Sequence, residues 1–121
     1  ASLAANNSYI DVTFNAGVYN TNGDSVVVSD FSLAFAQNGG PATAAAISSV
    51  KKDDFTSADS ASVLSGGETV IRMFLNITGT PGGVETILIM PADGSSIYNS
   101  DETAMSAVAG ISTTLNEFTG P

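Results

Sequence analysis

The strongest constraint on the fold of this chain is a run of alternating apolar residues between positions 68 and 78. One side of an extended chain here carries only apolar side chains, those of Ile71, Met73, Leu75 and Ile77. Successive side chains of a β-strand point to opposite faces, so this period of two indicates a strand with one wholly apolar face. Similar alternation marks residues 9–15, 31–35, 84–90 and 111–115, and the sequence contains no long amphipathic helix pattern.

Turn residues separate these segments. Glycine, proline and asparagine concentrate at 16–24, 38–41 and 79–83, where they supply the backbone conformations of tight turns. The first strand is therefore expected to end near Asn15. The Ala-rich segment 42–50 is also interpreted as a strand because a charged turn follows it, and a short valine run stands at 26–28. About seven short strands at intervals of roughly 8 to 12 residues favour an all-β fold, a two-sheet antiparallel β-sandwich, in a single domain over residues 1–121.

The inward faces of the predicted strands define the expected core. Its residues are Ile10, Val12, Phe14, Phe31, Leu33, Phe35, Ile71, Met73, Leu75, Ile87, Ile89, Ile111 and Leu115. Burying apolar surface contributes about 25 cal/mol per Å², so a set of this size stabilises a domain without disulfides. By contrast, residues 55–67 are rich in Ser, Ala and Asp without periodicity, which predicts a long insertion with room for a short helical turn. The whole stretch 51–67 is expected to form a mobile, acidic loop at an edge or end of the sandwich.

Composition limits the classes of function. The chain has no His, Cys or Trp, so it has no catalytic triad, cysteine nucleophile or zinc finger, and mainly binding or structural functions are left. Three basic residues against 12 acidic ones give a formal net charge of −9, which repels phosphate backbones and anionic lipids. Together with the absence of a long apolar run, this predicts neither nucleic acid binding nor membrane insertion.

Small uncharged residues supply most of the polarity of the chain. Ser, Thr, Asn and Gly mixed with Ala and Val are typical of secreted and cell-surface β modules. Because the sequence starts without Met, we expect a module excised from a larger multidomain protein, with an export signal outside this segment.

One polar loop is the candidate metal site. Its oxygen-bearing side chains are those of Asp93, Asn99, Asp101 and Glu102. Calcium takes six to eight oxygen ligands, and these groups have the right chemistry, although their spacing is not that of an EF-hand. The alternative interpretation is a solvated loop in an acidic protein. No cofactor is required, and calcium is the one candidate.

Two tyrosines are the candidate carbohydrate-binding residues. Tyr19 and Tyr98 each combine an aromatic ring, which stacks on a sugar face, with a hydroxyl group that forms hydrogen bonds. The alternative is a tyrosine at a strand end whose hydroxyl reaches water or backbone. A glycoside hydrolase would need two opposed carboxylates, and the long acids Glu68, Glu85 and Glu102 show no spacing that makes a pair, so no enzymatic activity is expected.

Four blocks, at 7–19, 28–33, 75–87 and 91–98, form a pattern over most of the chain. Two of them read Asn-Ser-Tyr-Ile-Asp-Val-Thr-Phe-Asn-Ala-Gly-Val-Tyr and Leu-Asn-Ile-Thr-Gly-Thr-Pro-Gly-Gly-Val-Glu-Thr-Ile. In sequence, order and spacing the blocks resemble bacterial immunoglobulin-like repeats of the SwmB type, although the usual Asp-x-x-Gly-Asn-Ala turn is replaced here by residues 99–104. The resemblance implies an immunoglobulin-like sandwich without enzymatic activity, in tandem arrays of large secreted, cell-surface or adhesin-like bacterial proteins.

The expected function is therefore a noncatalytic structural or adhesion module, a spacer, of a secreted or surface-anchored bacterial protein. Its expected partners are neighbouring domains of the same chain and a polysaccharide or cell-surface ligand. The alternative is a carbohydrate-binding module attached to a secreted polysaccharide-active enzyme.

Overall fold

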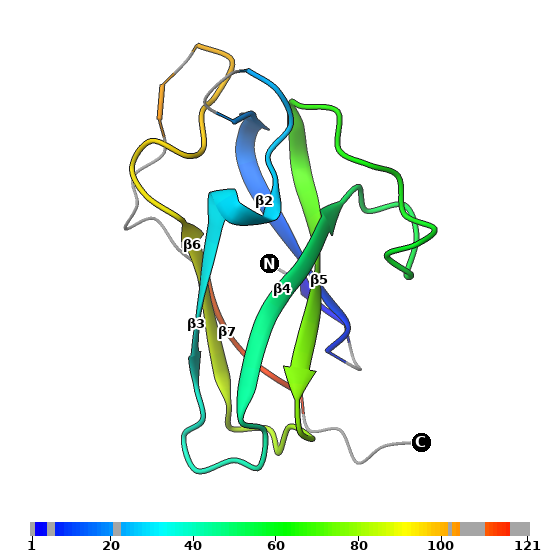
Figure 1. Cartoon of the computed structure of the whole chain (residues 1–121), viewed down its shortest axis with the longest axis vertical. Coiled ribbons are helices and arrows are strands. Elements are labelled where there is room, and N and C mark those ends of the chain that lie inside the picture. Colours follow the sequence, from blue (N-terminus) through cyan, green and yellow to red (C-terminus); the bar gives the residue numbers. More distant parts are fainter. Residues whose placement is uncertain (1, 5–6, 21–22, 102, 105–110, 117–121) are drawn as a thin grey trace.

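The computed structural model describes residues 2–4, 7–20, 23–101, 103–104 and 111–116. These residues form seven strands and one 3₁₀ turn (Figure 1). The elements are β1 (Ser2–Leu3), β2 (Tyr9–Val18), η1 (Val28–Asp30), β3 (Phe31–Ala36), β4 (Ala44–Lys51), β5 (Glu68–Thr78), β6 (Thr86–Pro91) and β7 (Ile111–Thr114).

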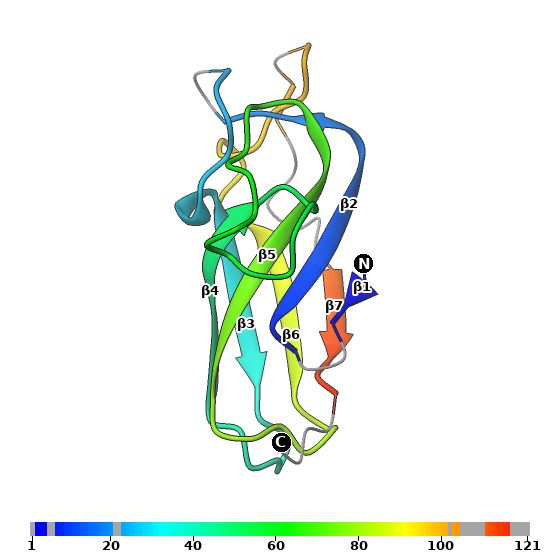
Figure 2. The ribbon, with the colours of Figure 1, turned by 90° about the vertical axis from the view of Figure 1, so that its right-hand side faces the viewer.

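The strands form two antiparallel sheets. One sheet has the order β1-β2-β5-β4 and the other the order β3-β6-β7. In Figure 2 the four-stranded sheet lies in front of the three-stranded one. With the strands lettered in chain order, this is the ABED and CFG arrangement of a constant-type immunoglobulin domain. The predicted all-β, immunoglobulin-like sandwich is confirmed.

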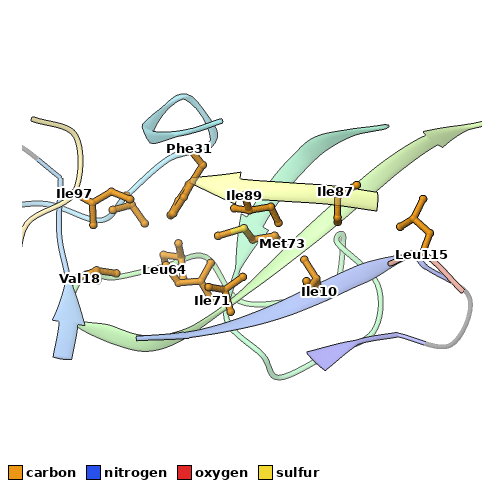
Figure 3. Packing of buried hydrophobic residues seen from close by; sticks show 12 residues of the cluster. Ile10, Val18, Phe31, Leu64, Ile71, Met73, Ile87, Ile89, Ile97 and Leu115 are labelled. Atoms are coloured by element: carbon orange, nitrogen blue, oxygen red, sulfur yellow. The ribbon is translucent and has the colours of Figure 1, made fainter. Parts of the chain in front are cut away.

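The core lies between the two sheets. Met73 and Ile71 of β5 are fully buried, and Ile87 and Ile89 of β6 face them from the other sheet (Figure 3). Every residue of the predicted core belongs to this apolar cluster or packs against it, some of them only partly buried. As expected from its apolar sequence, β6 is the central strand of its sheet.

The first long strand continues beyond the turn predicted near Asn15. β2 extends to Val18 because its register against β5 shifts between Thr13 and Val18, which lets the strand absorb the glycine in this segment. A Cβ atom on Gly17 would lie 2.5 Å from the carbonyl oxygen of Gly67, so only glycine permits this close approach of two backbones.

The valine run before β3 does not form a strand. Instead, Asp30 accepts a hydrogen bond from the Val27 N–H at 2.9 Å and closes the 3₁₀ turn η1. The one strand that the sequence did not predict is β1, because a strand of two residues is too short to show an alternating pattern.

The segment after β4, predicted to be a mobile insertion, contributes two buried residues to the core. Its residues Ala61 and Leu64 are 6% and 8% exposed, and Leu64 belongs to the main apolar cluster beside Ile71 (Figure 3). The short helical turn expected here is present, because the Ala61 N–H donates to the Ser57 carbonyl at 2.9 Å. The segment therefore crosses the outer face of the four-stranded sheet in Figure 2 and returns an apolar anchor to the interior.

Candidate functional site

The two candidate carbohydrate-binding tyrosines are neighbours. Tyr19 follows the end of β2, and Tyr98 lies in the loop after β6. Each N–H donates to the other residue's carbonyl oxygen at 2.8 Å, which makes an isolated antiparallel bridge. The bridge joins loops from the two sheets at the upper end of the molecule in Figure 1. The sequence singled out both residues but not their contact, because they are far apart along the chain.

The ring of Tyr19 lies against backbone. A Cβ atom on Gly67 would be 2.7 Å from the Tyr19 hydroxyl oxygen, and one on Gly66 would be 3.3 Å from its ring. Part of the Tyr19 side chain therefore packs against these two glycines. Tyr19 and Tyr98 are both half-buried, and of the two Tyr98 is the one that lines the hollow described next.

A small hollow adjoins the tyrosine bridge. It has a volume of about 150 Å³, and Tyr98, Asn99 and Thr103 line it together with apolar residues that include Phe14 and Ile97. The hollow thus combines an aromatic ring, an amide and a hydroxyl group on an apolar base, which is the mixture of groups found in small polar ligand sites.

Two of the four candidate calcium ligands, Asp93 and Asn99, help to close their own loop. Asp93 Oδ1 accepts hydrogen bonds from the Ser96 hydroxyl at 2.7 Å and the Ser95 N–H at 2.8 Å, and these two bonds lower the pKa of Asp93. Asn99 Oδ1 accepts from the N–H groups of Asp101 at 2.9 Å and Thr103 at 3.0 Å.

Glu102, the fourth candidate, lies outside the described residues. Within the described ranges, no three or more acidic side chains come together in a group that could hold a metal ion. Calcium binding by this loop stays a prediction.

Glu85 is buried at the opposite end of the sandwich. The whole residue is inaccessible to solvent, and its carboxylate accepts N–H hydrogen bonds from Ala42 and Gly82, both at 2.9 Å, and from Val84 at 3.3 Å. Burial raises the pKa of Glu85, but the backbone hydrogen bonds outweigh it and the net pKa is lowered. A side chain on Gly40 would overlap the carboxyl group. Glu85 therefore fastens two turns together as a buried anion.

Glu68 has a similar structural position nearer the surface. Its carboxylate accepts hydrogen bonds from the Ser65 N–H at 2.7 Å, the Ser65 hydroxyl at 3.0 Å and the Gly66 N–H at 3.0 Å. Burial raises its pKa, but these bonds prevail and lower it overall. The two described long acids thus hold separate turns, and the sequence did not reveal these contacts.

Arg72 organises the outer face of the four-stranded sheet. Its Nε and Nη2 groups donate to the two carboxylate oxygens of Asp11 at 2.7 and 2.8 Å, and Nη1 donates to the Phe55 carbonyl at 2.9 Å. The guanidinium carbon lies 4.0 Å from the ring centre of Tyr9, so the third tyrosine has one ring face covered. The hydrogen bonds to Asp11 raise the pKa of Arg72, with burial as the opposing effect.

Comparison with known proteins identifies no relative. No protein family model, curated protein or solved structure matches this chain. The resemblance to SwmB-type repeats accordingly stays a prediction. Over the described residues, no helix is long and apolar enough to cross a membrane.

Proposed function

We propose that this chain is a noncatalytic structural or adhesion module, a spacer, of a secreted or surface-anchored bacterial protein. The observation that carries the proposal is that the first strand, β1, and the last strand, β7, run in the same direction. β5 runs toward the lower end in Figure 1, and β1 runs the same way because both are antiparallel to β2. β7 also runs toward that end in Figure 2. In Figure 2 β1 lies near mid-height, so the support comes from the shared direction of the first and last strands, which suits modules joined in series.

Contacts between the segments that follow the first and last strands support a rigid module. The buried Asn7 side chain donates to the Asn116 carbonyl at 2.9 Å and accepts from the Asn116 N–H at 2.8 Å. The Asn116 side chain in turn donates to the Ala4 carbonyl at 3.1 Å. These bonds connect the segment after β1 to the segment after β7. A pulling force along the chain therefore acts on two segments that are hydrogen-bonded to each other.

Small-angle X-ray scattering of one copy and of two copies joined in series tests the spacer proposal. The longest strand, β5, has 11 residues, and a strand rises about 3.3 Å per residue, so a second copy is expected to lengthen the particle by roughly 36 Å. An unchanged maximum dimension, with two copies folded side by side, would refute a spacer.

Location is tested separately. An antibody against the module is expected to label intact cells that produce it. Labelling that requires permeabilised cells would refute a surface position. Neighbouring domains of the same chain are the proposed partners, and no cofactor is required.

A second candidate function is carbohydrate binding by a module attached to a polysaccharide-active enzyme. The hollow beside Tyr98 favours it, since Tyr98, Asn99 and Thr103, whose side chains carry an aromatic ring, an amide and a hydroxyl group, all line it. Binding to a polysaccharide panel should then be lost in Tyr98→Ala and kept in Tyr9→Phe, because the Tyr9 ring lies beneath Arg72. Equal binding by both variants would eliminate this candidate.

A further inference from the structure

An open groove runs beside the edge strand β4 and shares no lining residue with the hollow at Tyr98. Its volume is about 260 Å³, and its walls are residues 25–28, 48–51 and 63–64. The three segments come from the approach to η1, from the end of β4 and from the loop that follows β4. The volume is just below the ~300 Å³ at which pockets for drug-sized molecules begin, so the groove fits a smaller ligand.

The groove gathers exposed apolar surface. Among the described residues, the large hydrophobic side chains that stay exposed are Val27, Phe55, Val63 and Val84. Two of these line the groove, Val27 at 50% and Val63 at 70% exposure. Val26 and Leu64, which also contribute to the walls, are buried in the core. Exposed valines on a groove whose base is already apolar offer a surface that water solvates poorly.

A cation without an acidic partner lies on the same groove. Lys51 contributes to the wall formed by β4, and no carboxylate of the described chain lies within ion-pair distance of it. Arg72, by contrast, is paired with Asp11, and the charge of Lys52 acts on Asp54, whose pKa it helps to lower after the hydrogen bonds from Ser62. In a protein of net charge −9, Lys51 is therefore a cation that can meet an anion at this groove.

The wall also contains an unsatisfied polar atom. The Ser49 hydroxyl oxygen is buried and makes no hydrogen bond. Buried polar atoms in native proteins nearly always have a partner, so each exception needs an explanation. A polar ligand group at this end of β4 would supply one.

From these observations we propose that the groove binds a small amphiphilic carboxylate. The apolar tail lies along Val27 and Val63, and the carboxylate pairs with the Lys51 ammonium group. The charge of the site selects an anion, and the valines select a short hydrocarbon body. The proposal is independent of the spacer function, because it uses none of the residues of the chain termini or of the tyrosine bridge.

Nuclear magnetic resonance titration of the ¹⁵N-labelled chain with octanoate tests the site. Octanoate is expected to shift the amide signals of residues 25–28, 48–51 and 63–64 in a saturable way, with a dissociation constant on the order of 1 mM for a ligand of this size. Octanamide, which has the same tail without the charge, is expected to bind about fivefold more weakly. No saturation, or shifts centred elsewhere, would overturn the proposal. Shifts of the same signals on concentrating the protein alone would assign the groove to a second copy and overturn it as well.

Matched variants separate the charge from the tail. Lys51→Met keeps the stem of the side chain and should weaken octanoate binding about fivefold while leaving octanamide unchanged, whereas its neighbour Lys52→Met should change neither. Val63→Ser should weaken both ligands, and Phe55→Ser, an exposed apolar control outside the groove, should weaken neither. Because all four side chains are at least partly exposed, these variants are expected to fold. Equal losses in the two lysine variants, or in Val63→Ser and Phe55→Ser, would overturn the proposal.

Discussion

Leu64 joins the 52–67 segment to the core, and the Leu64→Ala variant measures how much stability that contact provides. The side chain is 8% exposed and lies among the buried residues of both sheets. Alanine removes three carbon atoms, each worth about 0.8 kcal/mol of lost burial, or about 2.4 kcal/mol in all. A cavity that does not collapse adds up to about 2 kcal/mol more. The expected loss in the free energy of unfolding is therefore about 2.4–4.4 kcal/mol.

The adjacent Val63 provides the control. It is 70% exposed, so Val63→Ala should cost less than about 0.5 kcal/mol. Urea unfolding followed by far-ultraviolet circular dichroism measures both variants, and tyrosine fluorescence serves as the second probe because the chain has no Trp. For a domain of this size, Leu64→Ala should lower Tm by on the order of 10 °C.

A loss below about 1 kcal/mol in Leu64→Ala, with an unchanged slope against urea, would refute this reasoning. The segment would then be an insertion that the sandwich does not need, as the sequence alone suggested. Equal losses in the two variants would refute the contrast between a buried anchor and an exposed neighbour.

Three further predictions concern charged groups. Because the pKa of Glu85 is below its ordinary value of 4.5 in the folded chain, the folded state binds fewer protons; its stabilising effect is present above pH 4.5 and is lost as the pH falls through the folded pKa. Urea unfolding between pH 3 and 7 should show a shallower acid loss in Glu85→Gln, together with a lower stability at pH 7 than in the more exposed Glu68→Gln; identical profiles for both variants would contradict this. A double-mutant cycle of Arg72→Met and Asp11→Asn should give a coupling of about 1–2 kcal/mol, since the pair has two charge-assisted hydrogen bonds and side chains only 13% and 20% exposed; a coupling near zero would mean that the pair is solvated. If the loop binds calcium as predicted, millimolar calcium should raise Tm by about 5 °C or more relative to chelator; a change below about 1 °C would contradict the site and would agree with the hydrogen bonds that Asp93 and Asn99 already accept within the loop.

Most of the strands could be predicted because their signal is local. The alternation at 68–78 coincides with β5, and that at 31–35 lies within β3, since a strand between water and a core must place apolar side chains on one face. Tyr19 and Tyr98 were each singled out from the sequence as candidate carbohydrate-binding residues, and that role stays a prediction. Their mutual bridge was not predicted, because hydrogen bonds between two backbones leave no mark on side-chain identity.

Three further core residues could not be predicted, because they lie in loop segments without an alternating pattern. Leu64, Ile97 and Val26 each lie outside any regular strand, and one to three apolar residues between polar neighbours have no period that tells which of them is buried. Their burial depends on where the loops cross the ends of the sandwich. Glu85 was available from the sequence only as an acid, and its burial follows from the three backbone N–H groups that two separate turns direct at it.

The sequence by itself determined the class of fold and, through its missing His and Cys, the chemistry that the chain lacks. The tertiary structure decided which residues outside the strands are buried in the core, which carboxylates hold turns together and which residues line the groove. Asp11 and Arg72 are 61 positions apart and Asn7 and Asn116 are 109 apart, yet each pair forms two hydrogen bonds. Periodicity reports only the environment of neighbouring residues. Contacts over such separations depend on the register between strands and the paths of loops, which the whole sandwich sets at once.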